Sequence, residues 1–212
     1  MKTLRCVLLV LLLFTLTACQ AGWVANLVTP SGGRLYWDEF SDPSSGWAIG
    51  SSQNGAVGYS AGAYRITVIS PNYQIWAVSH QSFLDVRLQV VATRIAGPLA
   101  SMYGLICYYQ DPGHFDFFIV SSDGYYSIGR MKNGTISLLG QNEMAYSSAI
   151  TSQTNSLSFE CAGSTLTGSV NGKVLAIAQQ TDFTGGDAGL IAGTFEQGGV
   201  DVRFQHFTVY KP

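Results

Sequence analysis

The sequence predicts an all-β protein, built as an antiparallel sandwich of two sheets. Three observations support this: apolar and polar residues alternate with period two, turn dipeptides separate the alternating runs, and no window has a convincing helical period. The composition agrees, because 24 glycines, 12% aromatic residues and only 11% charged residues are typical of short strands joined by tight turns. The low charge also argues against disorder.

The strands and turns follow in order along the chain. Residues 64–68 and 84–90 alternate most clearly, as expected of strands with one buried face. Three dipeptides that favour the positive φ angles of hairpin turns each separate two strand-like runs: Asp123-Gly124, Asn133-Gly134 and Asn171-Gly172. Hairpins make neighbouring strands antiparallel, and the spacing of the runs is typical of a two-sheet sandwich.

The N-terminus has the parts of a signal peptide, which we predict over residues 1–18. Lys2 and Arg5 precede an apolar run over 6–16, which is too short for the roughly 20 residues that a spanning helix needs. The run ends in Leu-Thr-Ala-Cys19, which resembles the lipobox of bacterial lipoproteins. The resemblance implies that Cys19 is lipidated and that the exported protein is lipid-anchored at the cell membrane or the outer membrane. An ordinary secretory signal with a chance cysteine is the alternative.

The remaining 194 residues suit one domain. Residues 19–33 are small, polar and unpatterned, so we predict a flexible tether there and the folded domain over 34–212. Two of the 11 basic residues lie in the predicted signal peptide, which leaves 9 basic against 13 acidic residues. This balance offers no basic patch for nucleic acid, and we expect the lipid to be the only membrane contact.

Four cysteines are present, and two of them have other fates in this interpretation. Cys6 leaves with the signal peptide and Cys19 carries lipid, so Cys107 and Cys161 remain as a pair in an exported protein. An oxidising compartment favours a disulfide between them, with two buried free thiols as the alternative. No metal site is predicted, because the three histidines have no spacing that would complete a zinc site.

Several segments together resemble a known family, the concanavalin A-like, laminin G-like jelly roll. They are LYWDEFSDPSSGW from residue 35, GLICYYQD from 104, HFDFFIVSSDGYYSIGRMKNG from 114, NSLSFECAG from 155, SVNGK from 169, GGDAGLIAGT from 185 and VRFQHFTVYKP from 202. More narrowly, they are similar to the branch named for a 3-keto-disaccharide hydrolase domain. The resemblance implies that the first and last strands pair. It also implies a Cys107–Cys161 disulfide, since cysteines at these positions recur together in exported members. One departure is FQHF at 204–207, where the family usually has FDNF, so an acidic side chain is missing there.

Two catalytic patterns can be tested on the sequence. Residues 58–62 match GxSxG, but an alternating strand follows instead of the helix that a nucleophile elbow needs, so we interpret them as a turn. Glycosidases need two carboxylates flanking the bond, and no two of the 13 acids stand two residues apart on one strand face. If the protein is an enzyme, a pair from different strands would come from Asp116, Glu143 and Glu196.

Aromatic residues concentrate between 103 and 126, and some of them could form a platform on which sugar rings stack. The alternative is that nearly all belong to the core. Trp37 and Phe118 are expected in the core, whereas Trp47 follows an Asp-Pro turn and is expected in a loop. The ligand-binding candidates are Trp47, Tyr108, Tyr109, Phe115, Phe117 and Tyr125.

The sequence favours a non-catalytic binding module on the cell envelope, whose partner is carbohydrate or a cell-surface protein. A glycan-cleaving enzyme, as the narrower family resemblance implies, and a structural or adhesion protein are the alternatives, because one sandwich fold hosts all three. No cofactor is predicted, since no phosphate loop, dinucleotide fingerprint or HExxH motif is present. The sequence does not indicate the oligomeric state.

Overall fold

The structure is a computed structural model that describes residues 32–212. The predicted signal peptide, the lipidation of Cys19 and all but the last two residues of the tether lie outside the described residues and stay predictions. Residues 32–212 lie in one compact unit, and regular structure in this part consists of strands. Within that part, no helix is long and apolar enough to cross a membrane.

Nine strands form the first sheet, here called sheet A. Its order is β14-β13-β12-β6-β16-β4-β3-β2, and β1 also pairs with β16. The bounds are β1 (Arg34–Asp38), β2 (Gly50–Ser52), β3 (Gly55–Tyr59), β4 (Tyr64–Val68), β6 (Val86–Ala96), β12 (Thr154–Ala162), β13 (Thr165–Val170), β14 (Lys173–Gln179) and β16 (Val200–Tyr210).

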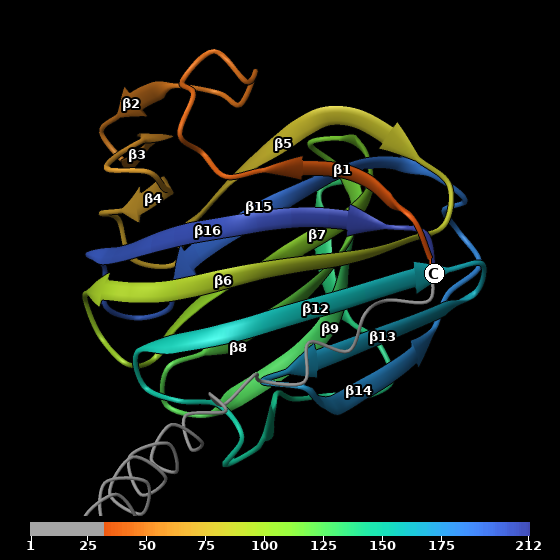
Figure 1. Ribbon diagram of the computed structural model, residues 1–212. Helices are drawn as coiled ribbons and strands as arrows, with labels where there is room; N and C mark the ends of the chain where they lie inside the picture. The colour runs from red at the N-terminus through yellow and green to blue at the C-terminus, as the bar shows by residue number, and fades with distance from the viewer. Residues whose placement is uncertain (1–31) are drawn as a thin grey trace, which may run out of the picture. The chain divides into compact units, whose positions relative to one another are not determined.

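Seven strands form the second sheet, sheet B. Its order is β10-β9-β8-β7-β15-β5, and β11 pairs with β9. The bounds are β5 (Gln74–Phe83), β7 (Ser101–Asp111), β8 (His114–Ser121), β9 (Tyr125–Lys132), β10 (Thr135–Leu138), β11 (Ala145–Tyr146) and β15 (Gly186–Thr194). Figure 1 shows β16, β6 and β12 of sheet A in front of β7, β8 and β9 of sheet B.

The predicted fold class, an all-β two-sheet antiparallel jelly-roll sandwich of the concanavalin A type, is confirmed. Every strand pair is antiparallel, and the first strand pairs with the last. The three predicted hairpins connect β8 to β9, β9 to β10 and β13 to β14. Residues 60–63 form a turn between β3 and β4, in which the Ser60 amide donates to the Ala63 carbonyl at 2.8 Å, so the GxSxG segment is a turn as predicted.

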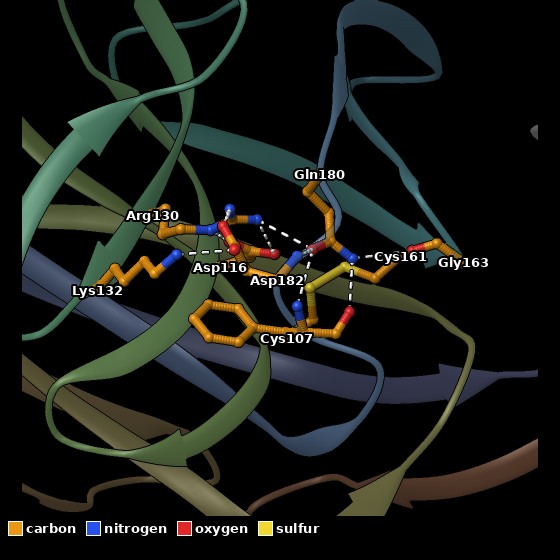
Figure 2. Close-up of polar contacts among 9 residues, drawn as sticks. Cys107, Asp116, Arg130, Lys132, Cys161, Gly163, Gln180 and Asp182 are labelled. Carbon is orange, nitrogen blue, oxygen red and sulfur yellow. Dashed lines mark hydrogen bonds and ion pairs between the residues drawn. A yellow bond between two sulfur atoms is a disulfide. The ribbon is translucent and has the colours of Figure 1, made fainter.

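The main core lies between the sheets, and the predicted disulfide crosses it. Alternate residues of each strand face inward, such as Leu88 on β6 and Leu105 on β7, and both are fully buried. Cys107 on β7 in sheet B is bonded to Cys161 on β12 in sheet A. The bond therefore joins the two layers, and Figure 2 shows it beside a cluster of charged side chains.

Trp37 is exposed, so its expected place in the core is wrong, whereas Trp47 lies in a loop as predicted but is buried. Tyr36 and Asp38 face inward on β1, so the alternation of the strand turns Trp37 outward, where its side chain is 53% exposed. Trp47 is only 3% exposed, because its indole packs against the rings of Tyr64 and Phe207. Trp47 therefore belongs to the core. Phe118 is fully buried in the core, as predicted.

Candidate functional site

A second apolar cluster covers the outer face of sheet B, the face turned away from sheet A. Its buried members alternate with the core residues of the same strands and are Met102, Ile106, Phe115, Phe117, Ile119, Met131 and Ile191. Trp76 and Tyr109 lie against Phe115, with ring centroids 5.3 and 5.7 Å away. The side chains cover one another, so most of this face is closed to a ligand.

The six ligand-binding candidates do not lie together. Trp47 and Tyr108 are buried in the main core, so the structure gives neither of them access to a ligand. Phe115 and Phe117 are buried in the outer-face cluster. Tyr109 is half-buried, and of the six only Tyr125, with an exposed fraction of 43%, lies open on the surface.

Tyr125 belongs to a separate exposed pair. Its ring meets that of Tyr146 edge to face, with centroids 5.6 Å apart. Tyr126, the neighbour of Tyr125 on β9, pairs with Val120 on β8. Val120 in turn pairs with Tyr103 on β7. Tyr125 therefore lies at the end of sheet B where β7 carries Tyr103. Tyr109 stands six residues further along that strand, about 20 Å away at the usual strand rise. The two tyrosines therefore cannot contact one sugar ring.

The structure does not bring the three catalytic candidates into one site. Asp116 is fully buried and Arg130 binds it through two nitrogens, with Nε 2.7 Å from Oδ1. Burial raises the pKa of the Asp116 carboxyl, and the Arg130 guanidinium acts against that rise. Glu143 is exposed between β10 and β11, and Glu196 is exposed between β15 and β16. Asp116 is therefore a buried ion-pair partner that faces the interior.

The Arg130 cluster fixes the loop that leads into β15 (Figure 2). Arg130 also binds Asp182 and the Gln180 Oε1 atom, the latter at 3.0 Å. Lys132 binds Asp182 from the solvent side at 2.7 Å. The side-chain Nε2 atom of Gln180 donates to the Phe183 carbonyl at 2.7 Å. A buried charged network of this kind is costly to leave incomplete, so it holds residues 180–183 in one conformation.

Three neighbouring strands are irregular at the same level of sheet B. β15 pairs with β5 and β7, and both ladders shift register between Asp187 and Gly189. The extra residues include His80 on β5 and Tyr108 on β7, which both have a φ of 54°. Non-glycine residues rarely adopt that region, and bulges are frequent beside functional sites because they re-aim side chains.

The bulge on β7 sets the direction of Tyr109. Cys107 and Tyr108 both face the main core, so the following residue, Tyr109, turns to the outer face. Gly186 allows β15 to lie close to the β7 backbone at this point. It has a φ of 151°, and a Cβ atom there would lie 2.5 Å from the Tyr108 carbonyl carbon. The irregular row therefore places Tyr109 and the start of β15 side by side.

A cleft of about 400 Å³ opens at this row. Its lining residues come from the end of β5, the end of β7 and the start of β15: Ser82, Phe83, Leu84, Tyr109, Gln110, Gly185, Gly186 and Asp187. Asp187 is half-buried, and within residues 32–212 no protein group donates a hydrogen bond to its carboxylate. Burial raises the pKa of Asp187, and nearby His80 acts in the opposite direction.

Three further clefts lie elsewhere on the described part of the chain. One of about 350 Å³ lies between β2, β3 and β5 and includes Tyr73, Gln74 and Trp76, and another lies along β3 and β4 beside Arg65. The third includes Leu99, Phe195 and Glu196. None of these clefts or the Asp187 cleft is lined by more than one carboxyl group. Within the described part of the chain, no group of three metal-ligating side chains is present.

Sequence reasoning did not select Asp187, His80 or Gln110. Asp187 stands among glycines in Gly-Gly-Asp-Ala-Gly, which is typical of a turn and gives no sign of a half-buried carboxylate. The available signal was the glycine pair itself, because consecutive glycines before a strand often mark a close approach of two backbones.

No protein-family model matches this chain, and no curated protein matches it either. Among solved structures, the carbohydrate-binding module CBM66 from Bacillus subtilis is 17% identical with a TM-score of 0.54, over 82% of this chain and 95% of that chain. The β-glucanase of Bacillus licheniformis is 13% identical with a TM-score of 0.60, over 86% of this chain and 99% of that chain. A Bacillus subtilis protein of unknown function with a galectin-like fold is 10% identical with a TM-score of 0.61, over 85% and 96%. At these identities the similarity shows the fold, which carbohydrate-binding modules and glycosidases share.

Proposed function

We propose that the protein is a non-catalytic binding module that recognises carbohydrate in the Asp187 cleft. The observation that carries the proposal is the Asp187 carboxylate, half-buried in a cleft and without a donor from the described protein. Its oxygens reach solvent in the cleft and accept no hydrogen bond from the described protein, so ligand hydroxyl groups can bind them in place of water. The single carboxylate favours binding over hydrolysis, because glycosidases need two.

The walls of the cleft suit a neutral sugar. The Tyr109 ring offers an apolar surface on which the C–H face of a pyranose or furanose can stack, and its hydroxyl group offers a hydrogen bond. Ser82 and Gln110 add a hydroxyl and an amide on the rim. Few convergent polar groups around an apolar wall are typical of small-ligand sites. Binding a sugar here would need no movement of the outer-face cluster.

A glycan array with the purified protein, followed by calorimetric titration of each hit, tests the proposal. Asp187→Asn should weaken binding about tenfold, the effect of losing a charge-assisted hydrogen bond. Tyr109→Ala should weaken it by a similar factor. Trp37→Ala removes an exposed aromatic side chain from sheet A and should leave the affinity unchanged.

Three results would contradict the proposal. They are an array without hits, equal affinities for the Asp187→Asn variant and the unchanged protein, and product release from a bound oligosaccharide. The last result would make the protein a glycan-cleaving enzyme, and loss of turnover on changing Glu143 or Glu196 would assign the catalytic acid.

A further inference from the structure

An aromatic and basic patch lies on the outer face of sheet A, at the end where the folded domain begins. Arg34 on β1, Tyr210 on β16 and Arg87 on β6 stand opposite one another in the strand register. The Arg34 guanidinium carbon lies 4.0 Å from the centroid of the Trp37 ring, and that of Arg87 lies 5.8 Å from the Tyr210 ring. We call Arg34, Trp37, Arg87 and Tyr210 the β1 patch.

The charge of this face is opposite to that of the domain. The described residues carry 9 basic and 13 acidic side chains. The outward positions of β1, β4, β6, β12 and β16 carry four arginines, at 34, 65, 87 and 203, against two acids, at 160 and 201. Asp201 binds Arg65 at 2.7 Å, and Glu160 lies 3.8 Å from Arg87. A negative domain therefore has one face with a positive excess.

Apolar side chains are exposed in the same place. Leu35 is half exposed, like its neighbour Trp37. Tryptophan and arginine favour the headgroup region of a bilayer, where the ring contacts acyl chains and the cation contacts phosphate. A soluble polyanion would match the charge and leave Leu35 and Trp37 in water. Charge and exposed apolar surface together fit an anionic phospholipid surface better.

The patch also lies where the rest of the chain attaches. The Lys211 backbone amide donates to the Gly33 carbonyl at 3.0 Å, so the two ends of the described part meet beside β1. If Cys19 carries lipid, the 15 residues up to Arg34 span at most about 50 Å when extended, and about 20 Å on average as a flexible chain. Such a tether keeps the patch near the membrane at a high effective concentration, so even a weak interaction with the lipid surface would hold the domain against it.

We infer that the outer face of sheet A docks on an anionic phospholipid surface through the β1 patch. The inference uses the predicted anchor at Cys19 and is independent of glycan binding. Sheet B lies on the other side of the sandwich, so docking leaves its outer face turned away from the membrane. The domain would then be held in one orientation instead of tumbling on its tether.

Hydrogen exchange on the full-length protein, reconstituted in vesicles through its own N-terminal segment, tests the inference. Vesicles of phosphatidylcholine alone are compared with vesicles that also contain phosphatidylglycerol. Peptides covering β1 and the end of β16 should exchange more slowly only with phosphatidylglycerol, and high salt should remove the difference. Arg34→Glu should lower the ratio of docked to undocked protein at least about fivefold, the effect expected for one basic residue near an anionic surface.

Trp37→Ala is the second variant, because it removes the apolar contact and keeps the charge. Lys173→Glu, a charge reversal at the far edge of sheet A, is the matched control and should leave the protection of β1 unchanged. Equal exchange in both kinds of vesicle would overturn the inference, as would protection of β5 or β15 in place of β1. Protection by phosphatidylcholine alone would overturn the role of the anionic lipid. Neither outcome bears on the glycan proposal, which its own titration tests.

Discussion

Two aromatic clusters in this protein have similar composition and different surroundings. The first, Phe40, Trp47, Tyr64 and Phe207, lies between the sheets, and the Tyr64 hydroxyl donates to the Ala48 carbonyl at 2.6 Å. The second, Trp76, Tyr109, Phe115 and Phe117, covers the outer face of sheet B and ends at the Asp187 cleft. Aromatic content therefore does not mark a binding site here. What distinguishes the second cluster is an edge that meets a polar cleft.

The largest expected effect is in the first cluster. Trp47→Ala should lower the free energy of unfolding by about 3–5 kcal/mol, since it leaves a large cavity among Phe40, Tyr64 and Phe207. Trp37→Ala is the control and should change stability by less than about 0.5 kcal/mol, because that side chain is exposed. Urea unfolding followed by circular dichroism gives both values. Equal losses for the two variants would show that the burial of these tryptophans is misassigned.

The disulfide comes next, since it joins the layers that enclose the first cluster. Replacing Cys107 and Cys161 together by Ala should cost about 2–4 kcal/mol, because the unfolded chain loses a cross-link between residues 54 positions apart. The same urea titration measures this loss. Two reactive thiols in the native unchanged protein would disprove the bond.

A smaller effect is expected where the second cluster is packed most tightly. The Phe117 ring lies over Gly129, where a Cβ atom would overlap its edge. Gly129→Ala should therefore destabilise the domain by about 1–3 kcal/mol through overpacking. Gly134→Ala meets no neighbouring atom but has a φ of 73°, so it serves as a control for backbone strain alone. Unchanged stability in Gly129→Ala would mean that the outer-face cluster is loosely packed.

The smallest expected effect is a gain in stability instead of a loss, and it concerns Asp187 in the cleft. Burial raises the pKa of Asp187, so the folded state holds this proton more tightly than the unfolded chain does. The unfolding free energy should fall as the pH rises from the ordinary carboxyl pKa, near 4, through the raised value. Asp187→Asn has no carboxyl group to ionise at this position. The variant should therefore be more stable than the unchanged protein above that pH window, by less than about 1 kcal/mol because solvent screens the Asp187 carboxylate. Thermal unfolding as a function of pH measures the difference, and a less stable variant at neutral pH would show that the protein already satisfies this carboxylate.

The parts of the molecule that follow from local chemistry were predictable from the sequence. Alternation gave the strands, and the Asn-Gly and Asp-Gly dipeptides gave three hairpins, because each depends on a few neighbouring residues. The pairing of Cys107 with Cys161 followed from the count of cysteines left in an exported domain.

The candidate site depends on features that local patterns do not encode. A bulge reverses the side-chain alternation after it, and nothing in Cys107-Tyr108-Tyr109 indicates that the alternation breaks between Cys107 and Tyr108. Trp37 was wrongly expected in the core for a related reason. Alternation shows that one of Tyr36 and Trp37 faces inward, and only the packing of β1 on β16 decides which of them does.

The central claim is that a ligand occupies the Asp187 cleft and leaves both aromatic clusters unchanged. Mapping the backbone amide shifts by NMR while titrating the best glycan from the array tests it most directly. The account predicts shifts at Tyr109, Gln110, Gly186 and Asp187, and small shifts near Tyr125 and Trp37. Shifts concentrated at the Tyr125–Tyr146 pair or on sheet A would contradict it.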